Sequence, residues 1–197
     1  MLAEVAPVRV VRLFPAQSPV LVIASDGRAD NESALSASVL LHNPANGLRM
    51  GLCTMLSKEL QSRWSGKHCI GEVESVPLVL AVVYLAKYLV GRDAVWWIDN
   101  SSTLGACIKG GSRAEDLDRS VITLHLACAM LGTRIWFEYV ESKSNWADGS
   151  SRLLLLDPWS SEHGFSMAQV HTPEWPWKSR LCELVDHLEE NLRAALE

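Results

Sequence analysis

Pro19-Val-Leu-Val-Ile-Ala-Ser-Asp26-Gly27 is an almost unbroken apolar run that ends in an acid and a glycine. This pattern predicts a buried strand that opens into a turn. Ala94-Val-Trp-Trp-Ile-Asp99 repeats the pattern, with an apolar run that again ends in an acid. The sequence therefore predicts two buried strands, each with a carboxylate at its C-terminal end.

A hairpin and a helix are expected between these two strands. Residues 34–41 and 48–55 are apolar runs that flank an Asn-Pro-Ala-Asn-Gly sequence, which is typical of a hairpin. Residues 70–90 carry apolar side chains at helical spacing. Pro77 is tolerated only in about the first turn of a helix, so we expect this helix to begin near residues 72–75.

The rest of the chain predicts a mixed sheet covered by helices. After the second strand we expect two helices, the second ending at Gly132, then a strand over 133–140 and a helix over 144–155. Strands joined through helices run parallel, which predicts an α/β fold with a mixed five-stranded sheet flanked by helices. Frequent Trp and Pro residues then indicate an irregular arm, followed by a terminal helix over 178–196. The expected divisions are a lead-in (1–18), the domain (19–155) and the C-terminal arm and helix (156–197).

Composition narrows the class of protein. The chain is 48% hydrophobic and 21% charged, as in globular domains. No apolar run reaches the roughly 18 residues that cross a membrane, and we see no secretory signal, so we expect a cytoplasmic or nuclear protein without a membrane partner. Five cysteines without a Cys-x-x-Cys spacing fit free thiols better than disulfides or a zinc site. The net charge of −5 argues against a broad basic face for nucleic acid, although clustered acidic metal ligands also lower the total.

The acids at the two strand ends predict a metal site. The carboxyl ends of parallel strands meet at one edge of a sheet, so Asp26 and Asp99 are expected side by side. Neighbouring buried carboxylates are unstable unless they are protonated or neutralised. Mg²⁺ suits such oxygen ligands, and two metal ions about 4 Å apart can support an in-line phosphoryl displacement.

Three further segments extend the pattern: Ile70-Gly-Glu-Val-Glu74, Trp97-Ile-Asp99-Asn-Ser-Ser-Thr103 and Ser142-Lys-Ser-Asn-Trp-Ala-Asp148-Gly-Ser-Ser-Arg152. With the strand through Asp26, they make residues 19–155 resemble type 1 ribonuclease H domains, most closely those of retroelement reverse transcriptases. Four acids in the right order, each on the expected element, carry this resemblance. Its most distinctive part is the Asn-x-Ala-Asp-x-x-Ser-Arg ending.

The resemblance implies a ribonuclease H-like fold and hydrolysis of the RNA strand of RNA–DNA hybrids by a two-metal mechanism. It implies two Mg²⁺ ions, replaceable by Mn²⁺, with Asp26 and Asp99 binding both ions, Glu74 on the leaving-group side and Asp148 on the nucleophile side. A reverse transcriptase polymerase domain is a further expected partner. The substrate-binding residues expected from the resemblance are Asn100, Ser101, Lys143, Asn145 and Arg152.

Each acid also has an ordinary explanation. Asp26 could be a turn residue, Asp99 an N-cap, and Asp148 the third residue of a helix capped by Asn145. Glu72 is an alternative to Glu74, although the match of the preceding isoleucine to the family's apolar position favours Glu74. The eight tryptophans are interpreted as packing residues, except that Trp64 and Trp146 lie in segments expected near the site.

Two departures from the family keep other functions open. The loop over 141–145 has no histidine, and residues 91–132 lack the basic helical handle that grips the hybrid in many cellular enzymes. One alternative is therefore a nuclease or strand-transferase of the same superfamily that acts on DNA. The other is a retroelement-derived structural or binding module without catalysis.

Overall fold

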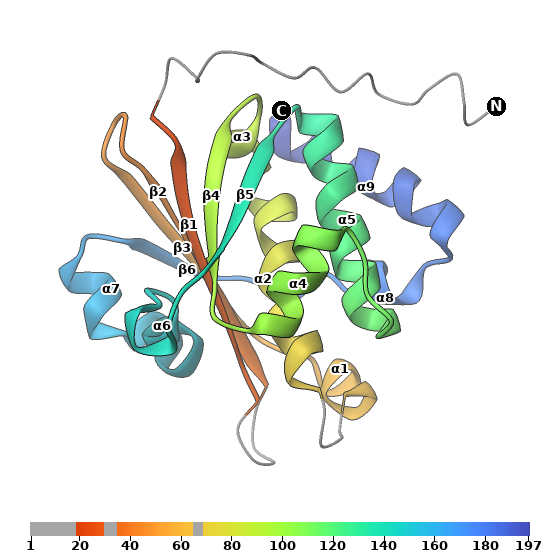
Figure 1. Cartoon of the computed structure of the whole chain (residues 1–197), viewed down its shortest axis with the longest axis horizontal. Coiled ribbons are helices and arrows are strands. Elements are labelled where there is room, and N and C mark those ends of the chain that lie inside the picture. Colours follow the sequence, from red (N-terminus) through yellow and green to blue (C-terminus); the bar gives the residue numbers. More distant parts are fainter. Residues whose placement is uncertain (1–18, 30–34, 65–68) are drawn as a thin grey trace.

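The computed structural model describes residues 19–29, 35–64 and 69–197, without the side chains of residues 181 and 182 (Figure 1). Its strands are β1 (Leu21–Arg28), β2 (Ser36–Asn43), β3 (Leu48–Met55), β4 (Asp93–Ile98), β5 (Arg134–Tyr139) and β6 (Ser166–Gln169). Its α-helices are α1 (Lys58–Arg63), α2 (Ile70–Tyr84), α3 (Ala86–Leu89), α4 (Ser101–Lys109), α5 (Glu115–Leu131), α6 (Asp148–Leu153), α7 (Pro158–Glu162), α8 (Trp175–Lys178) and α9 (Leu181–Leu196). Two short 3₁₀ helices, η2 (Ser142–Ser144) and η3 (Leu154–Leu156), flank α6.

The strands form one mixed sheet in the order β5-β4-β1-β2-β3-β6. Strands β1, β2 and β3 pair antiparallel, whereas the β1–β4, β4–β5 and β3–β6 pairs are parallel. The predicted α/β class with a helix-flanked mixed sheet is confirmed. The sixth strand, β6, comes from the segment that we predicted to be an irregular arm, and it pairs with the hairpin strand β3.

Helices cover both faces of the sheet (Figure 1). The larger core lies between the sheet and the helices α2, α5 and α9, which stand on the right in the figure. Helices α6 and α7 cover the opposite face over a smaller cluster. The buried members of that smaller cluster are Ala24, Leu40, Ala147 and Phe165.

Helix α2 departs from its predicted bounds because it is buried on every side. It begins at Ile70 rather than near residues 72–75, so Pro77 lies inside the helix and not in its first turn. Pro77 cannot donate the backbone hydrogen bond to residue 73, a loss that normally disfavours a helix interior. Here the residues from Val73 to Val83 are all buried, and their packing outweighs that loss. The predicted single helix to residue 90 is also interrupted after Tyr84, where α3 follows as a separate turn.

Strands β1 and β4 are adjacent and parallel, as predicted, but β1 does not end at Asp26. Its pairing with β4 ends at Ser25, opposite Ile98, while its pairing with β2 continues through Asp26 to Arg28. Asp26 therefore lies within a strand and just beyond the end of its neighbour, rather than in a turn. Because β4 has ended there, the side of β1 at Asp26 is open to residues that follow β4.

Two expectations from composition can be compared with the structure. The cysteines at positions 53, 69, 107 and 128 are free thiols, and the side chain of Cys182 lies outside the described residues. Among the described helices, none combines the length and apolarity that a membrane span requires.

We predict that Gly27→Ala destabilises the protein because β1 and α2 approach each other at this glycine. A Cβ atom at position 27 would lie 2.5 Å from the backbone nitrogen of Glu74 and 2.6 Å from its Cα atom. Backbone atoms cannot rotate away, so overpacking should cost about 1–3 kcal/mol of unfolding free energy in a urea titration. Gly105→Ala is the control, because nothing lies within 4 Å of that position in α4. Alanine should be neutral there or stabilise by up to about 1 kcal/mol. Equal unfolding free energies for the two variants would contradict the close approach.

Candidate active site

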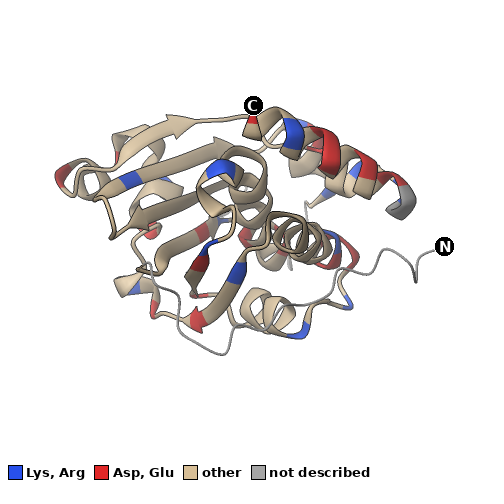
Figure 2. Ribbon diagram, turned by 90° about the horizontal axis from the view of Figure 1, so that it is seen from above, with Lys and Arg blue, Asp and Glu red and all other residues tan. Residues whose placement is uncertain are grey.

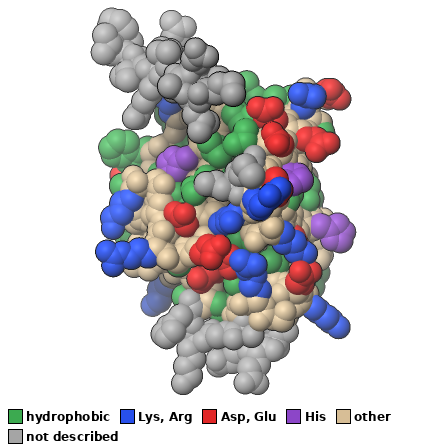
Figure 3. All heavy atoms as spheres, turned by 90° about the vertical axis from the view of Figure 1, so that its right-hand side faces the viewer, with side chains coloured by type: hydrophobic (Ala, Val, Ile, Leu, Met, Phe, Trp, Pro, Cys, Tyr) green, Lys and Arg blue, Asp and Glu red, His purple; other side chains and the backbone are tan. Residues whose placement is uncertain are grey.

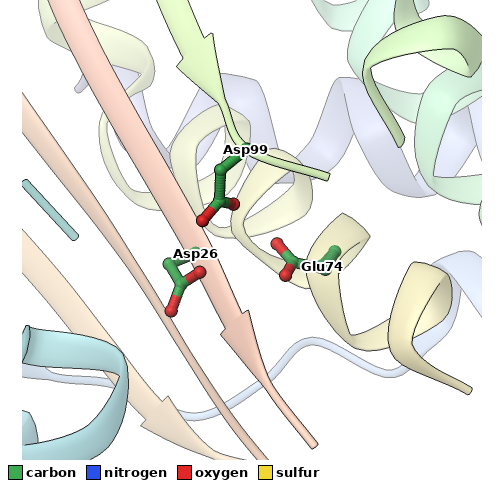
Figure 4. A group of neighbouring side chains, drawn as sticks. All are labelled: Asp26, Glu74 and Asp99. Atoms are coloured by element: carbon green, nitrogen blue, oxygen red, sulfur yellow. The ribbon is translucent and has the colours of Figure 1, made fainter. Parts of the chain in front are cut away.

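Three acidic side chains converge where the pairing of β1 with β4 ends (Figure 4). Asp26 comes from β1, Asp99 directly follows β4, and Glu74 reaches the same place from α2. Each offers a carboxylate oxygen, and these oxygens lie within 4.8 Å of one another. Asp26 and Glu74 are only 5% and 6% exposed, and Asp99 is partly buried. This acidic triad could hold a metal ion.

The pleat of β1 directs Asp26 toward the face that carries α6. Side chains alternate between the two faces of a strand, so Asp26 shares its face with Ala24, which packs in the cluster under α6. The hydroxyl of Ser151 in α6 donates a hydrogen bond to Asp26 Oδ2. Asp26 therefore has one carboxylate oxygen held by α6.

Serine side chains of β2 form hydrogen bonds that attach α6 to the sheet beside Asp26. The Ser36 hydroxyl donates to the carbonyl oxygen of Ser151 at 2.7 Å, and the Ser38 hydroxyl donates to that of Ala147 at 3.0 Å. Ser38 is the cross-strand neighbour of Asp26, so these contacts lie next to the triad. Sequence analysis missed this pair of serines, although small polar residues two positions apart in an apolar strand are a signal that could have found them.

Glu74 is positioned by the close approach of α2 to β1. The backbone N–H of Gly27 donates to Glu74 Oε2 at 3.0 Å. The absence of a side chain at Gly27 allows this contact, because a Cβ atom there would overlap the backbone of α2. Among the described residues, the triad includes Glu74 and not Glu72. One carboxylate oxygen of Glu72 is buried and has no hydrogen-bond partner there.

Burial and mutual repulsion shift the pKa values of two triad members upward. Desolvation, together with the charges of Asp99 and Asp148, raises the pKa of Asp26 to about 6, although the Ser151 hydrogen bond opposes this rise. Desolvation, reinforced by the charges of Asp26 and Asp99, raises the pKa of Glu74 to about 9. Without a compensating positive charge, Glu74 therefore holds its proton at neutral pH, and Asp26 ionises less readily than an exposed aspartate.

A divalent cation fits this arrangement. The triad offers carboxylate oxygens, which are the ligands that Mg²⁺ and similar hard ions take in proteins. Oδ1 of Asp99 is buried and has no hydrogen-bond partner in the described structure, so it is available as a ligand. Its desolvation would be offset by a bound cation.

Asp148, the fourth predicted ligand, lies beside the triad rather than within it. It is the first residue of α6, and its carboxylate pairs with Arg152 at 2.9 Å. Its charge contributes to the raised pKa values of Asp26 and Glu74, so it is within electrostatic reach of both. The alternative explanation of Asp148 as the third residue of a helix capped by Asn145 does not hold, because α6 begins at Asp148 and Ala147 is its N-cap. The Asn145 side chain instead accepts from the N–H of Ala147 and donates to the carbonyl oxygen of Ser25.

The five predicted substrate-binding residues have different environments. Asn100 caps α4 by accepting from the N–H groups of Ser102 and Thr103, so Asp99 does not act as the N-cap. Asn145 is buried and its amide is engaged as described above. Ser101 is exposed at the start of α4 and Lys143 is exposed within η2, while Arg152 is exposed and paired with Asp148.

Of the two tryptophans expected near the site, only Trp146 lies close to it. Trp146 adjoins Asp148 and packs edge-on against Trp97 of β4, with ring centroids 5.1 Å apart. Trp64 is 4% exposed and packs against Trp177, while its indole N–H donates to Asp116. Trp64 is therefore a core residue on the face of the sheet that α2, α5 and α9 cover.

Comparisons with known proteins support the fold. No family model and no curated protein sequence matches the chain. Ribonuclease H1 of the halophilic archaeon Halobacterium salinarum superposes with a TM-score of 0.53 at 15% identity, over 70% of this chain and 98% of that one. The N-terminal ribonuclease H domain of a Mycobacterium tuberculosis protein gives a TM-score of 0.50 at 14% identity, over 66% of this chain and 89% of that one. At such identities the likeness establishes a ribonuclease H-like fold.

We predict that the metal-free protein loses stability as the pH rises, and that Glu74 is a main cause. The folded-state pKa of Glu74, about 9, exceeds its unfolded value of 4.5, so the folded state binds the proton more tightly. The resulting stabilisation is present below pH 4.5 and is lost as the pH rises toward about 9. Melting temperatures in EDTA, measured between about pH 5 and pH 9, should therefore fall more steeply for the parent than for Glu74→Gln. Parallel pH profiles for the two proteins would show that Glu74 ionises normally.

Proposed function

We propose that the chain is a metal-dependent endoribonuclease that hydrolyses the RNA strand of RNA–DNA hybrids by a two-metal mechanism, with Mg²⁺ as its natural ion. The observation that carries this proposal is the triad of Asp26, Glu74 and Asp99 within 4.8 Å. The ribonuclease H-like fold and the nearby Asp148 support it. Three carboxylates held close together, with the pKa values of Asp26 and Glu74 raised, are characteristic of a functional site rather than a stabilising one.

The resemblance to ribonuclease H domains implies a division of roles among the acids. Asp26 and Asp99 lie at the centre, where the pairing of β1 with β4 ends, and would contact both ions. Glu74 would complete the site from α2 on the leaving-group side, and Asp148 would complete it from α6 on the nucleophile side. When bound, the two ions would activate the attacking water and stabilise the leaving oxygen.

The chain's own residues prepare the site for this chemistry. Ser151 and the backbone N–H of Gly27 each hold one carboxylate oxygen in place, so little reorganisation is needed when a cation arrives. Asp148 keeps Arg152 beside the triad, where the guanidinium lowers the pKa of Asp26. That charge partly offsets the repulsion among the acids.

Substrate binding through a broad basic surface is not supported. Lys and Arg positions are interspersed with Asp and Glu on the ribbon, and α9 carries a run of acidic positions (Figure 2). On the side of the molecule that lies at the right in Figure 1, positive and negative side chains are again interspersed (Figure 3). Several cations of the described residues are paired, as in Arg63–Asp116 at 2.5 Å and Lys178–Glu59 at 2.9 Å. Within 91–132, Arg92 and Arg119 donate to groups of the protein itself.

An origin in a retroelement, and a reverse transcriptase polymerase domain as partner, rest on the Asn-x-Ala-Asp-x-x-Ser-Arg sequence around Asp148. A cytoplasmic or nuclear location rests on composition. We include these as part of the proposal.

Asp99→Asn should abolish hybrid cleavage and yet raise the melting temperature in EDTA. The substitution removes one charge from the crowded triad and keeps the size of the side chain, which relieves repulsion. The expected rise is about 2–4 °C for each kcal/mol relieved. The variant should also lose the stabilisation that Mg²⁺ gives the parent. Melting curves of both proteins, with EDTA and with Mg²⁺, test this. A variant less stable than the parent in EDTA would mean that Asp99 is a structural residue.

Glu74→Gln should abolish cleavage, whereas Glu72→Gln should leave most of it. The two residues lie on the same helix, but only Glu74 joins the triad. Each variant is assayed on an RNA–DNA hybrid and on duplex DNA of the same sequence, with Mg²⁺ and with EDTA. Equal cleavage of both substrates by the parent would favour a DNA-acting nuclease. No cleavage, together with no thermal stabilisation by Mg²⁺, would favour the non-catalytic module.

A further inference from the structure

A cavity of about 350 Å³ opens on the side of Asp148 that faces α7. One wall belongs to the connection between β5 and α6, and the other is Trp159, from the chain beyond residue 155. The lining residues are Ser142, Lys143, Ser144, Asn145, Trp146, Asp148, Gly149 and Trp159. The cavity thus joins a predicted metal ligand to a part of the chain that the ribonuclease H resemblance does not cover.

The aromatic wall is held by packing behind it. The rings of Trp146 and Trp159 lie 6.0 Å apart at an angle of 31°. Trp159 stacks on His163 at 4.0 Å, and the His163 ring also bonds the Trp159 carbonyl oxygen at 2.8 Å. Phe165 packs against both indoles. Trp146 and Trp159 are both partly buried, and these ring contacts hold their orientations where they line the cavity.

The polar wall offers a cation and hydroxyl groups. Lys143 is exposed and has no carboxylate partner among the described residues. The flanking Ser142 and Ser144 are exposed as well. Asp148, the one acid in the lining, is already paired with Arg152 at 2.9 Å. The ammonium group of Lys143 is therefore free to meet an anion from outside.

We propose that this cavity binds one unpaired nucleotide of a nucleic-acid strand, with the base against Trp146 and Trp159 and a phosphate at Lys143. Indoles stack on any base, and lysine and serine are common phosphate partners. A simple anion would leave the indoles unused. A base inside a duplex is covered on both faces by its neighbours, so only an unpaired nucleotide can stack here. The cavity volume, near the lower end of the range of about 300–1,000 Å³ for small-ligand sites, suits a single nucleotide rather than a duplex.

This inference rests on the proposed function in one respect. Because the cavity shares Asp148 with the candidate active site, the bound nucleotide would neighbour the scissile phosphate. The enzyme would then prefer hybrid that adjoins a single strand over blunt hybrid. The cavity would also supply the substrate contact that the basic residues of 91–132 do not provide.

The binding step is tested without metal, so that it does not depend on catalysis. A short oligothymidylate is titrated into the protein in EDTA at several salt concentrations, and intrinsic tryptophan fluorescence is followed. Lys143→Gln should weaken binding and reduce the slope of log affinity against log salt by about 0.7, the loss of one phosphate contact with a single strand. Trp159→Leu should weaken binding about fivefold or more, as expected for the loss of one stacked base.

Trp136→Leu is the matched control, because Trp136 is 67% exposed on β5 and does not line the cavity. It should bind the oligonucleotide as the parent does. Trp159 packs against Phe165, so its replacement could disturb α7, but Lys143 is exposed and its replacement cannot. Lys143→Gln therefore decides the matter. Parent-like affinity and salt slope in this variant would overturn the proposal, as would equal weakening by Trp136→Leu.

A second measurement separates this inference from the proposed function. If hybrid is cleaved, the parent should cut hybrid with an unpaired extension faster than blunt hybrid, and Lys143→Gln should remove the difference. Cleavage with no such difference would overturn the nucleotide site and leave the nuclease proposal intact. Oligonucleotide binding that depends on Lys143, in a protein that cleaves nothing, would overturn the nuclease proposal and leave the nucleotide site intact.

Discussion

The repulsion among three carboxylates in a largely buried space is the constraint on which this structure depends. Asp26, Glu74 and Asp99 come from three separate elements, and their oxygens are held within 4.8 Å. Isolated side chains would separate or take up protons, as the raised pKa values of Asp26 and Glu74 show. The apolar packing of α2 against the sheet keeps the acids together, because moving Glu74 away would open that core. Stability gained in the core is thus used to hold a site that is unfavourable in the absence of a cation.

Two polar interfaces convert this packing into a defined geometry. On one face of β1, Gly27 has no side chain, so α2 can approach closely. The backbone N–H of Gly27 then donates to the Glu74 carboxylate. On the other face, Ser36 and Ser38 attach α6, which brings the Ser151 hydroxyl to Asp26. Each interface fixes one acid through a neutral donor. The donors orient the carboxylates without cancelling their charge, so a cation would still be attracted.

Local sequence patterns were enough to predict strands β1 to β5 and to bring Asp26 and Asp99 together, and the family resemblance added Glu74. Neither predicted the contacts between distant elements. An apolar run that ends in an acid is a short-range signal, and it placed Asp26 and Asp99 on adjacent parallel strands. Pro77 misled the prediction, because the burial of α2 on all sides is a tertiary effect that outweighs a local penalty. The role of Asn145 also depends on a contact with a distant element, because its amide donates to the carbonyl oxygen of Ser25 instead of capping a helix. Strand β6 has only four residues and is mostly exposed, so it carries no apolar alternation to detect.

The chain beyond residue 155 belongs to the same packed unit as the ribonuclease H-like part. It adds β6 to the sheet, and it places Phe165 in the smaller core cluster and Trp177 in the larger one. The indole N–H of Trp177 donates to two groups of α5, the carbonyl oxygen of Asp116 and the buried hydroxyl of Ser120. Removing this segment would expose apolar surface on both faces of the sheet. The same packing fixes the ring of Trp159 beside Asp148, so the segment shapes the surroundings of the candidate active site as well as the core.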